Sequence, residues 1–275
     1  MTRSYVGPSA LRDLLTQLTP RSLAVIRCVS ELRFVSASQL SRMFGDDELS
    51  PASRARAMRR ALERLAALDC LVPLPRRIGG GRSGSSATVY RLGLAGQRIA
   101  IHYGWLSARR TRRSAVPGSL FVAHAVAVAE VHTQLVEADR GGRLELLERN
   151  AEPACWRSYA GIGSFASVQL KPDSFVRFVV GDYEYSVFIE VDMGTEGSRT
   201  IQRKLGAYVS YHRLGIEQER FGVFPKVQWL TPTPSRIDFL EAEIEQLPGS
   251  ERELFGVGLV DDALKAITTP NDAES

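Results

Sequence analysis

Three acidic residues stand in two strand-like runs of the segment KPDSFVRFVVGDYEYSVFIEVDMGTE, residues 171–196. If the central Gly-Asp pair alone forms a hairpin loop, Asp173 lies directly opposite Glu190, and Asp192 shares their face because strand side chains alternate. A four-residue loop would set Asp173 opposite Asp192 instead. Either register brings like charges to a Cβ separation of about 5 Å, which destabilises a hairpin unless something neutralises them.

Two ways of neutralising these acids are consistent with the sequence. A hard divalent cation, Mg²⁺ or Mn²⁺, is usually held by one or two carboxylates plus water, so the acids could form a metal site. Lys171 and Lys204 could instead supply the compensating charge. The first arrangement predicts a metal-binding nuclease centre, and the second predicts only a hairpin with charged ends.

Positive and negative charges are divided unequally along the 275 residues. Residues 1–118 contain 20 Arg, no Lys and 7 acidic residues, a net charge of +13. The remaining residues contain 15 basic and 24 acidic residues, a net charge of −9. A basic first half indicates a polyanionic partner, and clustered arginines without an amphipathic membrane helix favour nucleic acid.

Other features of the composition are those of an ordinary soluble protein. No uninterrupted apolar run approaches the roughly 18 to 20 residues of a membrane span, and the N-terminus lacks the apolar core of a signal peptide. We therefore expect a cytoplasmic protein with no membrane partner. Cys28, Cys70 and Cys155 are isolated and odd in number, which predicts reduced, buried thiols and neither a disulfide framework nor a zinc site.

The basic half predicts a small helical module that ends in a hairpin. Apolar spacing and capping residues predict a short leading helix over residues 9–18 and then helices over 21–32, 38–44 and 51–69. Two strand-like runs at residues 70–77 and 88–96 flank the turn-rich segment IGGGRSGSSA. The third of the main helices has a buried stripe of Met58, Leu62, Leu65 and Leu68, and arginines cover its remaining surface.

This order of three helices and a hairpin, over about residues 20–100, resembles the winged-helix family of DNA-binding domains. The resemblance implies that the third helix enters the major groove of double-stranded DNA and that the hairpin, or wing, touches its backbone. The alternatives are that the arginines only form a solvated face, or that the module binds a protein. The predicted DNA-binding residues are Arg54, Arg56, Arg59 and Arg60 on the helix, Arg76, Arg77 and Arg82 in the wing, and Arg109, Arg110, Arg112 and Arg113 in a basic linker.

The second half alternates helices and strands in an α/β order. An apolar helix over residues 119–138 precedes three antiparallel strands at 143–149, 167–180 and 183–193, and then a helix at 197–215, a strand at 222–233 and a helix at 235–247. The predicted domains are a DNA-binding domain at 1–103, the basic linker at 104–118, an α/β domain at 119–250 and a C-terminal tail at 251–275.

The acidic hairpin of this half resembles the core of the PD-(D/E)XK nucleases, because Asp173 follows Pro172 and Glu190 stands on the next strand before a helix. The runs LKPDSF, IEVDMGTE and RKLGAYVSYH after a winged helix are, more narrowly, similar to the replication-relaxation family of plasmids and other mobile elements. The fold class implied is α/β (α+β), a winged helix-turn-helix domain followed by a PD-(D/E)XK nuclease-like mixed-sheet domain. The resemblance covers residues 20–247.

One position departs from the nuclease pattern, since Asp192 stands where a lysine is expected. Lys204 on the following helix could replace that lysine. The resemblance then implies a catalytic set of Asp173, Glu190, Asp192 and Lys204, with Mg²⁺ or Mn²⁺ held by the first three. If Lys204 does not reach the site, the domain is a silent relic used for binding or dimerisation.

Two functions follow from these resemblances. The first is a DNA-binding protein, with a homodimer left open, that acts in replication, transfer or regulation of a plasmid or other mobile element through its winged helix. Its nuclease-like domain would be degenerate. The alternative is a Mg²⁺-dependent endodeoxyribonuclease, a nickase that uses the four residues of the catalytic set.

Overall fold

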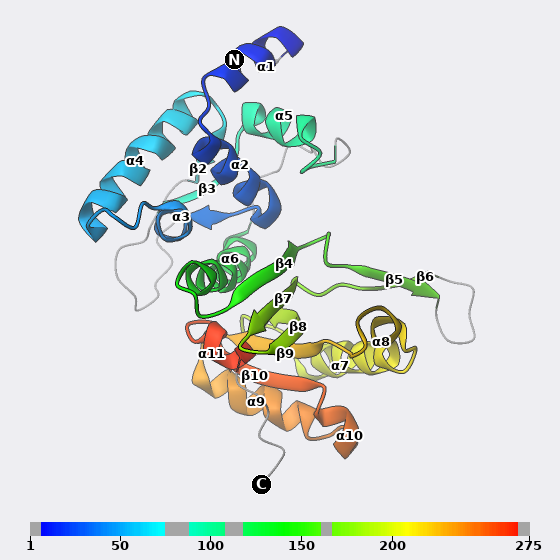
Figure 1. The fold of residues 1–275 in the computed structure, drawn as a ribbon. Helices are drawn as coiled ribbons and strands as arrows, with labels where there is room; N and C mark the ends of the chain where they lie inside the picture. Colours follow the sequence, from blue (N-terminus) through cyan, green and yellow to red (C-terminus); the bar gives the residue numbers. More distant parts are fainter. Residues whose placement is uncertain (1–6, 75–87, 108–117, 161–166, 269–275) are drawn as a thin grey trace. The chain divides into compact units, whose positions relative to one another are not determined.

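The computed structural model describes residues 7–74, 88–107, 118–160 and 167–268 (Figure 1). The chain divides into two compact units, Met1–Ala129 and Glu130–Ser275, and the division falls within one long helix. Arg76, Arg77, Arg82, Arg109, Arg110, Arg112 and Arg113, from the predicted wing and linker, lie outside the described residues.

The first unit is mainly helical and has a small sheet. In chain order it contains α1 (Pro8–Thr16), α2 (Pro20–Leu32), β1 (Val35–Ser36), α3 (Ala37–Phe44), α4 (Pro51–Ala67), β2 (Leu71–Pro73), β3 (Val89–Leu92), α5 (Leu94–His102) and the start of α6 (Ser119–Arg140). The three strands are antiparallel in the order β1-β3-β2. The predicted sequence of three main helices followed by two paired strands is confirmed.

Local signals at the helix ends explain why these helices begin where they do. The Ser36 hydroxyl accepts a hydrogen bond from the backbone N–H of Gln39, and the Gln39 side chain accepts one from the Ser36 N–H, so both hydrogen bonds of an N-terminal capping box are present in α3. Ser50 caps α4, with Pro51 at its first position. Met58, Leu62 and Leu65 of the predicted stripe are buried in α4, whereas Leu68 is half-buried and follows the helix as its C-cap.

The second paired strand is shorter than predicted. Residues 88–96 were expected to be one strand, but β3 ends at Leu92 and α5 begins at Leu94. The residue at the N-cap of α5 provides no capping side chain. The Asp69 carboxylate caps the helix instead, from a distant part of the sequence, by accepting a hydrogen bond from the Leu94 N–H at 3.2 Å. Two glycines near this start masked the helical pattern of the following residues.

The second unit is built around a five-stranded mixed sheet. It contains the end of α6, β4 (Glu145–Ala151), β5 (Arg157–Ala160), β6 (Ser167–Leu170), β7 (Ser174–Val180), β8 (Tyr183–Val191), α7 (Ser198–His212), α8 (Ile216–Phe221), β9 (Lys226–Thr231), α9 (Pro234–Ile244), α10 (Gly249–Arg252), β10 (Phe255–Leu259) and α11 (Ala263–Thr268). The strand order is β10-β9-β8-β7-β4, antiparallel on the β4 side of β8 and parallel beyond it. The mixed α+β class is confirmed.

Different helices cover the two faces of this sheet. Phe175, Phe188 and Trp229 share one buried cluster with Leu205 of α7 and Leu240 of α9. On the other face, His132 of α6 lies 2.8 Å from the Ser174 hydroxyl, measured from Nε2 to Oγ. Side chains alternate between the two faces of a strand. Those at every second position from Phe175 and Phe188 therefore point to the α7 face.

The structure differs from the prediction at two places in this unit. The expected strand over 167–180 is broken at Lys171–Asp173, and its first part pairs with the unpredicted β5 in a separate two-stranded sheet. Proline 172 supplies no N–H for a ladder, which explains the break. Residues 251–275 were expected to be a tail, but Phe255–Leu259 pairs with β9 as β10. Its two glycines hid the strand pattern.

The hairpin that carries the acids has the predicted two-residue loop. Val180 pairs with Tyr183 and Ser174 pairs with Ile189, without a shift between them. Gly181 adopts a φ of 59°, a conformation that glycine tolerates without strain. One position beyond the Ser174–Ile189 pair, the register sets Asp173 level with Glu190.

Buried thiols and a long apolar helix complete the fold. Cys28, Cys70 and Cys155 are free and buried, as predicted. By length and composition alone, helix α6 is long and apolar enough to cross a membrane. This is weak evidence for a membrane span, because the core helices of soluble proteins pass the same test. Several of its residues, among them Ala129, Val131 and Leu135, are buried in the protein.

Two glycines in helices provide a paired test of this packing. An added Cβ at Gly96 of α5 would overlap the backbone carbonyl of Cys70, whereas one at Gly206 of α7 would meet nothing within 4 Å. We expect Gly96→Ala to lower the free energy of unfolding by about 1–3 kcal/mol through overpacking. We expect Gly206→Ala to raise it by about 0.5–1 kcal/mol through helix propensity. Urea unfolding followed by circular dichroism measures both, and effects of the same sign would contradict the described packing.

Candidate functional site

The four predicted arginines of α4 do not share one environment. Arg56, Arg59 and Arg60 are exposed, as expected of a contact surface. Arg54 is half-buried, and its guanidinium pairs with the Asp47 carboxylate at 3.1 Å and donates to the Asp46 carbonyl oxygen. Arg54 therefore holds the loop before α4 as well as facing the surface.

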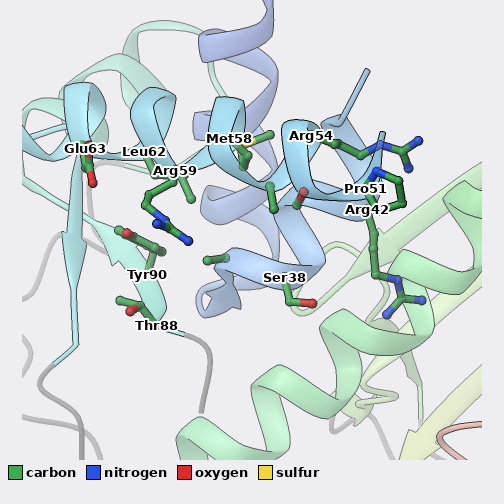
Figure 2. A pocket seen from close by; sticks show the side chains of 13 residues that line it. Ser38, Arg42, Pro51, Arg54, Met58, Arg59, Leu62, Glu63, Thr88 and Tyr90 are labelled. Atoms are coloured by element: carbon green, nitrogen blue, oxygen red, sulfur yellow. The ribbon is translucent and has the colours of Figure 1, made fainter. Parts of the chain in front are cut away.

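A groove of about 790 Å³ opens between α3, α4 and β3 (Figure 2). Its floor is apolar, with Ala55, Met58 and Leu62 of α4 among the lining residues, and Arg59 extends from α4 towards the strand that carries Tyr90. Polar and cationic side chains complete the lining: Ser38, Ser41, Arg42, Arg54, Arg59, Glu63, Thr88 and Tyr90. Three arginines and four hydroxyls are donors suited to phosphate oxygens.

Sequence reasoning missed the part of this groove that α3 contributes. Ser38 and Arg42 are four residues apart, so they lie on one face of α3, and Ser41 is close to both. That spacing was visible in the sequence. The sequence alone did not show that this spacing forms a groove wall, because β3 reaches the same side of α3 only through its sheet pairing with β1 and β2.

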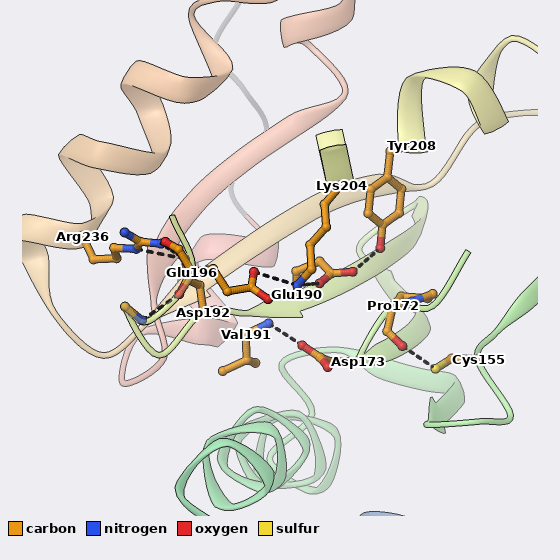
Figure 3. A network of polar contacts seen from close by, with 11 residues as sticks. Cys155, Pro172, Asp173, Glu190, Val191, Asp192, Glu196, Lys204, Tyr208 and Arg236 are labelled. Carbon is orange, nitrogen blue, oxygen red and sulfur yellow. Dashed lines mark hydrogen bonds and ion pairs between the residues drawn. The ribbon is translucent and has the colours of Figure 1, made fainter. Parts of the chain in front are cut away.

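Glu190 is the centre of a second polar site, in the other unit (Figure 3). Its side chain is only 4% exposed, and its two oxygens have different partners. The Tyr208 hydroxyl donates to Oε1 at 2.6 Å, and the Lys204 ammonium lies 3.3 Å from Oε2. Burial, and after it the charge of Asp173, raise the pKa of Glu190 to about 7, although Lys204 and Tyr208 act in the opposite direction.

Lys204 reaches this site from α7 and bridges two acids. Its ammonium is 2.9 Å from Glu196 Oε2 as well as 3.3 Å from Glu190 Oε2. Burial lowers the pKa of Lys204, but Glu190 and Glu196 more than offset this, so its pKa is raised and it stays charged. Lys171, the other expected neutraliser, instead lies 4.8 Å from the centre of the Trp156 ring.

Asp173 is held at the edge of the same site by the backbone. Its Oδ2 accepts a hydrogen bond from the Val191 N–H at 2.7 Å, one residue after Glu190. The Cys155 thiol donates to the carbonyl oxygen of Pro172 at 3.0 Å, which fixes the turn that precedes Asp173. The predicted grouping of Asp173 with Glu190 and Lys204 therefore matches the structure.

Asp192 takes part in a neighbouring network. Its Oδ2 accepts hydrogen bonds from Nε and Nη2 of Arg236 at 2.9 and 2.7 Å, and its Oδ1 accepts one from the Gly194 N–H at 2.6 Å. The Arg236 guanidinium also donates to the Glu196 carbonyl oxygen. Arginine 236 lies in α9, so no local sequence signal pointed to it.

These contacts determine whether a metal fits. Both oxygens of Glu190, both oxygens of Asp192 and Oδ2 of Asp173 already have donors or a cation. Among the residues that the structure describes, no group of three or more His, Cys, Asp or Glu is arranged to hold a metal ion. The described residues therefore show no preformed Mg²⁺ or Mn²⁺ site, and the predicted ligands are held by protein donors instead.

A family model described as replication-relaxation matches residues 26–227. The chain belongs to the replication-relaxation family. The match spans both units, from α2 to the start of β9, and so includes α4 and the acidic hairpin.

Membership in the replication-relaxation family suggests a role in the replication or transfer of a plasmid or mobile element. Neither the comparison with curated proteins nor that with solved structures found a match. Family membership therefore indicates the general process, and the roles of individual residues are inferred from the groove beside α4 and the site around Glu190.

The Asp192–Arg236 pair allows a direct test of internal charge compensation. The side chains of Asp192 and Arg236 are 0% and 12% exposed, whereas Arg213, paired with Glu251, is 62% exposed. We expect Arg236→Met to lower the free energy of unfolding by about 3 kcal/mol or more, because it leaves a buried carboxylate without its cation. Arg213→Met, the matched control, should cost less than about 1 kcal/mol. Equal losses in urea unfolding would contradict this assignment.

Proposed function

We propose that this protein binds double-stranded DNA through a winged helix in its first unit, and that it thereby acts in replication, transfer or regulation of a plasmid or other mobile element. The observation that carries the proposal is the arginine-lined groove beside α4. Family membership supplies the process in which such binding would be used.

The element order of the first unit supports the winged-helix assignment. Helices α2, α3 and α4 are followed by β2 and β3, and β1 joins the same sheet between α2 and α3. In that arrangement α4 is the helix that enters the major groove, and α3 lies against the backbone. The segment between β2 and β3, where a wing tip would be, lies outside the described residues.

Charge favours DNA over a protein partner for this surface. Helix α4 contains a single acidic residue, Glu63. Its exposed basic residues are Arg56, Arg59, Arg60 and Arg64. Each arginine that neutralises a phosphate releases condensed counterions, which gives affinity that falls steeply with salt. Arg42 and the α3 hydroxyls add donors on the second wall of the groove, where a phosphate backbone can be followed by hydrogen bonds.

We do not extend the proposal to metal-dependent cleavage. Lys204 does reach Glu190, as a migrated lysine would. However, the same lysine and Tyr208 occupy both Glu190 oxygens, and Arg236 compensates Asp192. The proposal therefore treats the nuclease-like unit as a degenerate one, in which the acids stabilise the fold.

The test compares two double variants with equal change of charge. Arg59→Ala/Arg60→Ala removes two exposed arginines of α4, and Arg199→Ala/Arg203→Ala removes two exposed arginines of α7 in the acidic unit. We expect the first variant to weaken duplex binding about tenfold or more at low salt and to reduce the slope of log K against log salt by about 2. Fluorescence anisotropy with a labelled duplex over a salt series measures both quantities. If the two variants bind alike, α4 is not the contact surface.

A further inference from the structure

An aromatic cluster at the end of α5 takes no part in the groove beside α4. Tyr103 and Trp105 follow α5 directly, and their rings stack with centroids 4.7 Å apart and planes 13° from parallel. Tyr103 is 44% exposed, which is high for a large aromatic side chain, and Trp105 is half-buried. The cluster therefore presents an aromatic surface to solvent.

The backbone builds this stack by a tight reversal after the helix. Gly104 adopts a φ of 74°, which favours glycine, and the Trp105 N–H donates to the Ala100 carbonyl oxygen at 2.8 Å. These features fold the chain back so that residues on either side of Gly104 place their rings face to face. The exposed ring is thus held in place by the backbone.

Arginine and histidine side chains lie near the stack. The Arg27 guanidinium lies 5.9 Å from the Trp105 ring centre, although it also pairs with Glu31 at 2.8 Å. The His102 ring meets Tyr103 edge-on, with centroids 5.1 Å apart. Arg98 is exposed one helical turn before His102, on the same side of α5.

We propose that this cluster binds unpaired bases of single-stranded nucleic acid, with a base stacked on Tyr103 and the neighbouring arginines facing the phosphates. Aromatic side chains beside positive charge are the usual means of binding single strands without sequence preference, because every base has a π-face. The unit's net positive charge attracts the strand, and the fixed ring requires little ordering when a base stacks on it.

The chemistry favours single strands over the duplex at this surface. In a duplex the base faces are stacked on one another, so an exposed tyrosine ring has no face to meet, and phosphates alone need no aromatic group. The cluster shares no residue with the groove beside α4. This inference therefore goes beyond the proposed duplex binding and does not depend on it.

The test uses three tyrosine variants and short labelled oligo(dT), oligo(U) and duplex probes. Tyr103→Ala removes the exposed ring, Tyr103→Phe keeps it, and Tyr183→Ala removes another tyrosine, 72% exposed, from the second unit. By fluorescence anisotropy we expect Tyr103→Ala to weaken oligo(dT) binding at least about fivefold, the low end for losing one base stack. Tyr103→Phe and Tyr183→Ala should bind as the wild type does, and duplex affinity should not change.

A second readout reports stacking directly. Binding of oligo(dT) should quench tryptophan fluorescence, and Trp105→Phe should remove most of that quenching, since Trp156 and Trp229 belong to the other unit. If Tyr103→Ala and Tyr183→Ala have equal affinity for both single strands, the proposal is overturned. Equal losses on duplex and single strand would also overturn it, because they would indicate a general charge or folding effect. The oligo(U) arm shows whether the site distinguishes RNA from DNA.

Discussion

The second unit depends on how it accommodates a buried carboxylate, that of Glu190, in the middle of its sheet. An isolated charge there would be costly, and Asp173 lies level with it in the hairpin. Lys204 and Tyr208, one turn apart on α7, supply the compensating charge and hydrogen bond. The same contacts therefore satisfy the acid and attach α7 to the sheet, and Arg236 does the equivalent for Asp192 from α9.

This compensation bears on function because a nuclease centre needs free carboxylate oxygens for a metal. Here the acids resemble such a centre in their order along the chain and in the two-residue hairpin loop, yet their oxygens are bound by the protein's own donors. In the basic first unit, by contrast, arginines and hydroxyls line a groove, and Arg27 lies beside an aromatic stack. We propose that recognition of nucleic acid belongs to the first unit and that the acidic residues of the second unit stabilise its fold.

Much of this arrangement could be predicted from local signals. The Gly181–Asp182 loop fixed the hairpin register, and Ser50 with Pro51 marked the start of α4. Among the missed elements, α5 has glycines at and near its start and β10 contains two, and both depend on partners far along the chain. Arg236 and the groove wall of α3 were missed for the same reason, since tertiary packing brings them to their sites. The contact of Tyr208 with Glu190 was not predicted, because a periodic pattern shows which face of a helix is buried but not which hydroxyl donates to an acid.

We propose that the acidic cluster stabilises the second unit and does not cut DNA. The most direct test is incubation of supercoiled plasmid with the wild-type protein and with Asp173→Ala, in Mg²⁺ and in Mn²⁺, followed by gel analysis of the nicked and linear forms. The account predicts that neither protein converts plasmid faster than the other or faster than buffer. Nicking by the wild type that is lost in Asp173→Ala would contradict it.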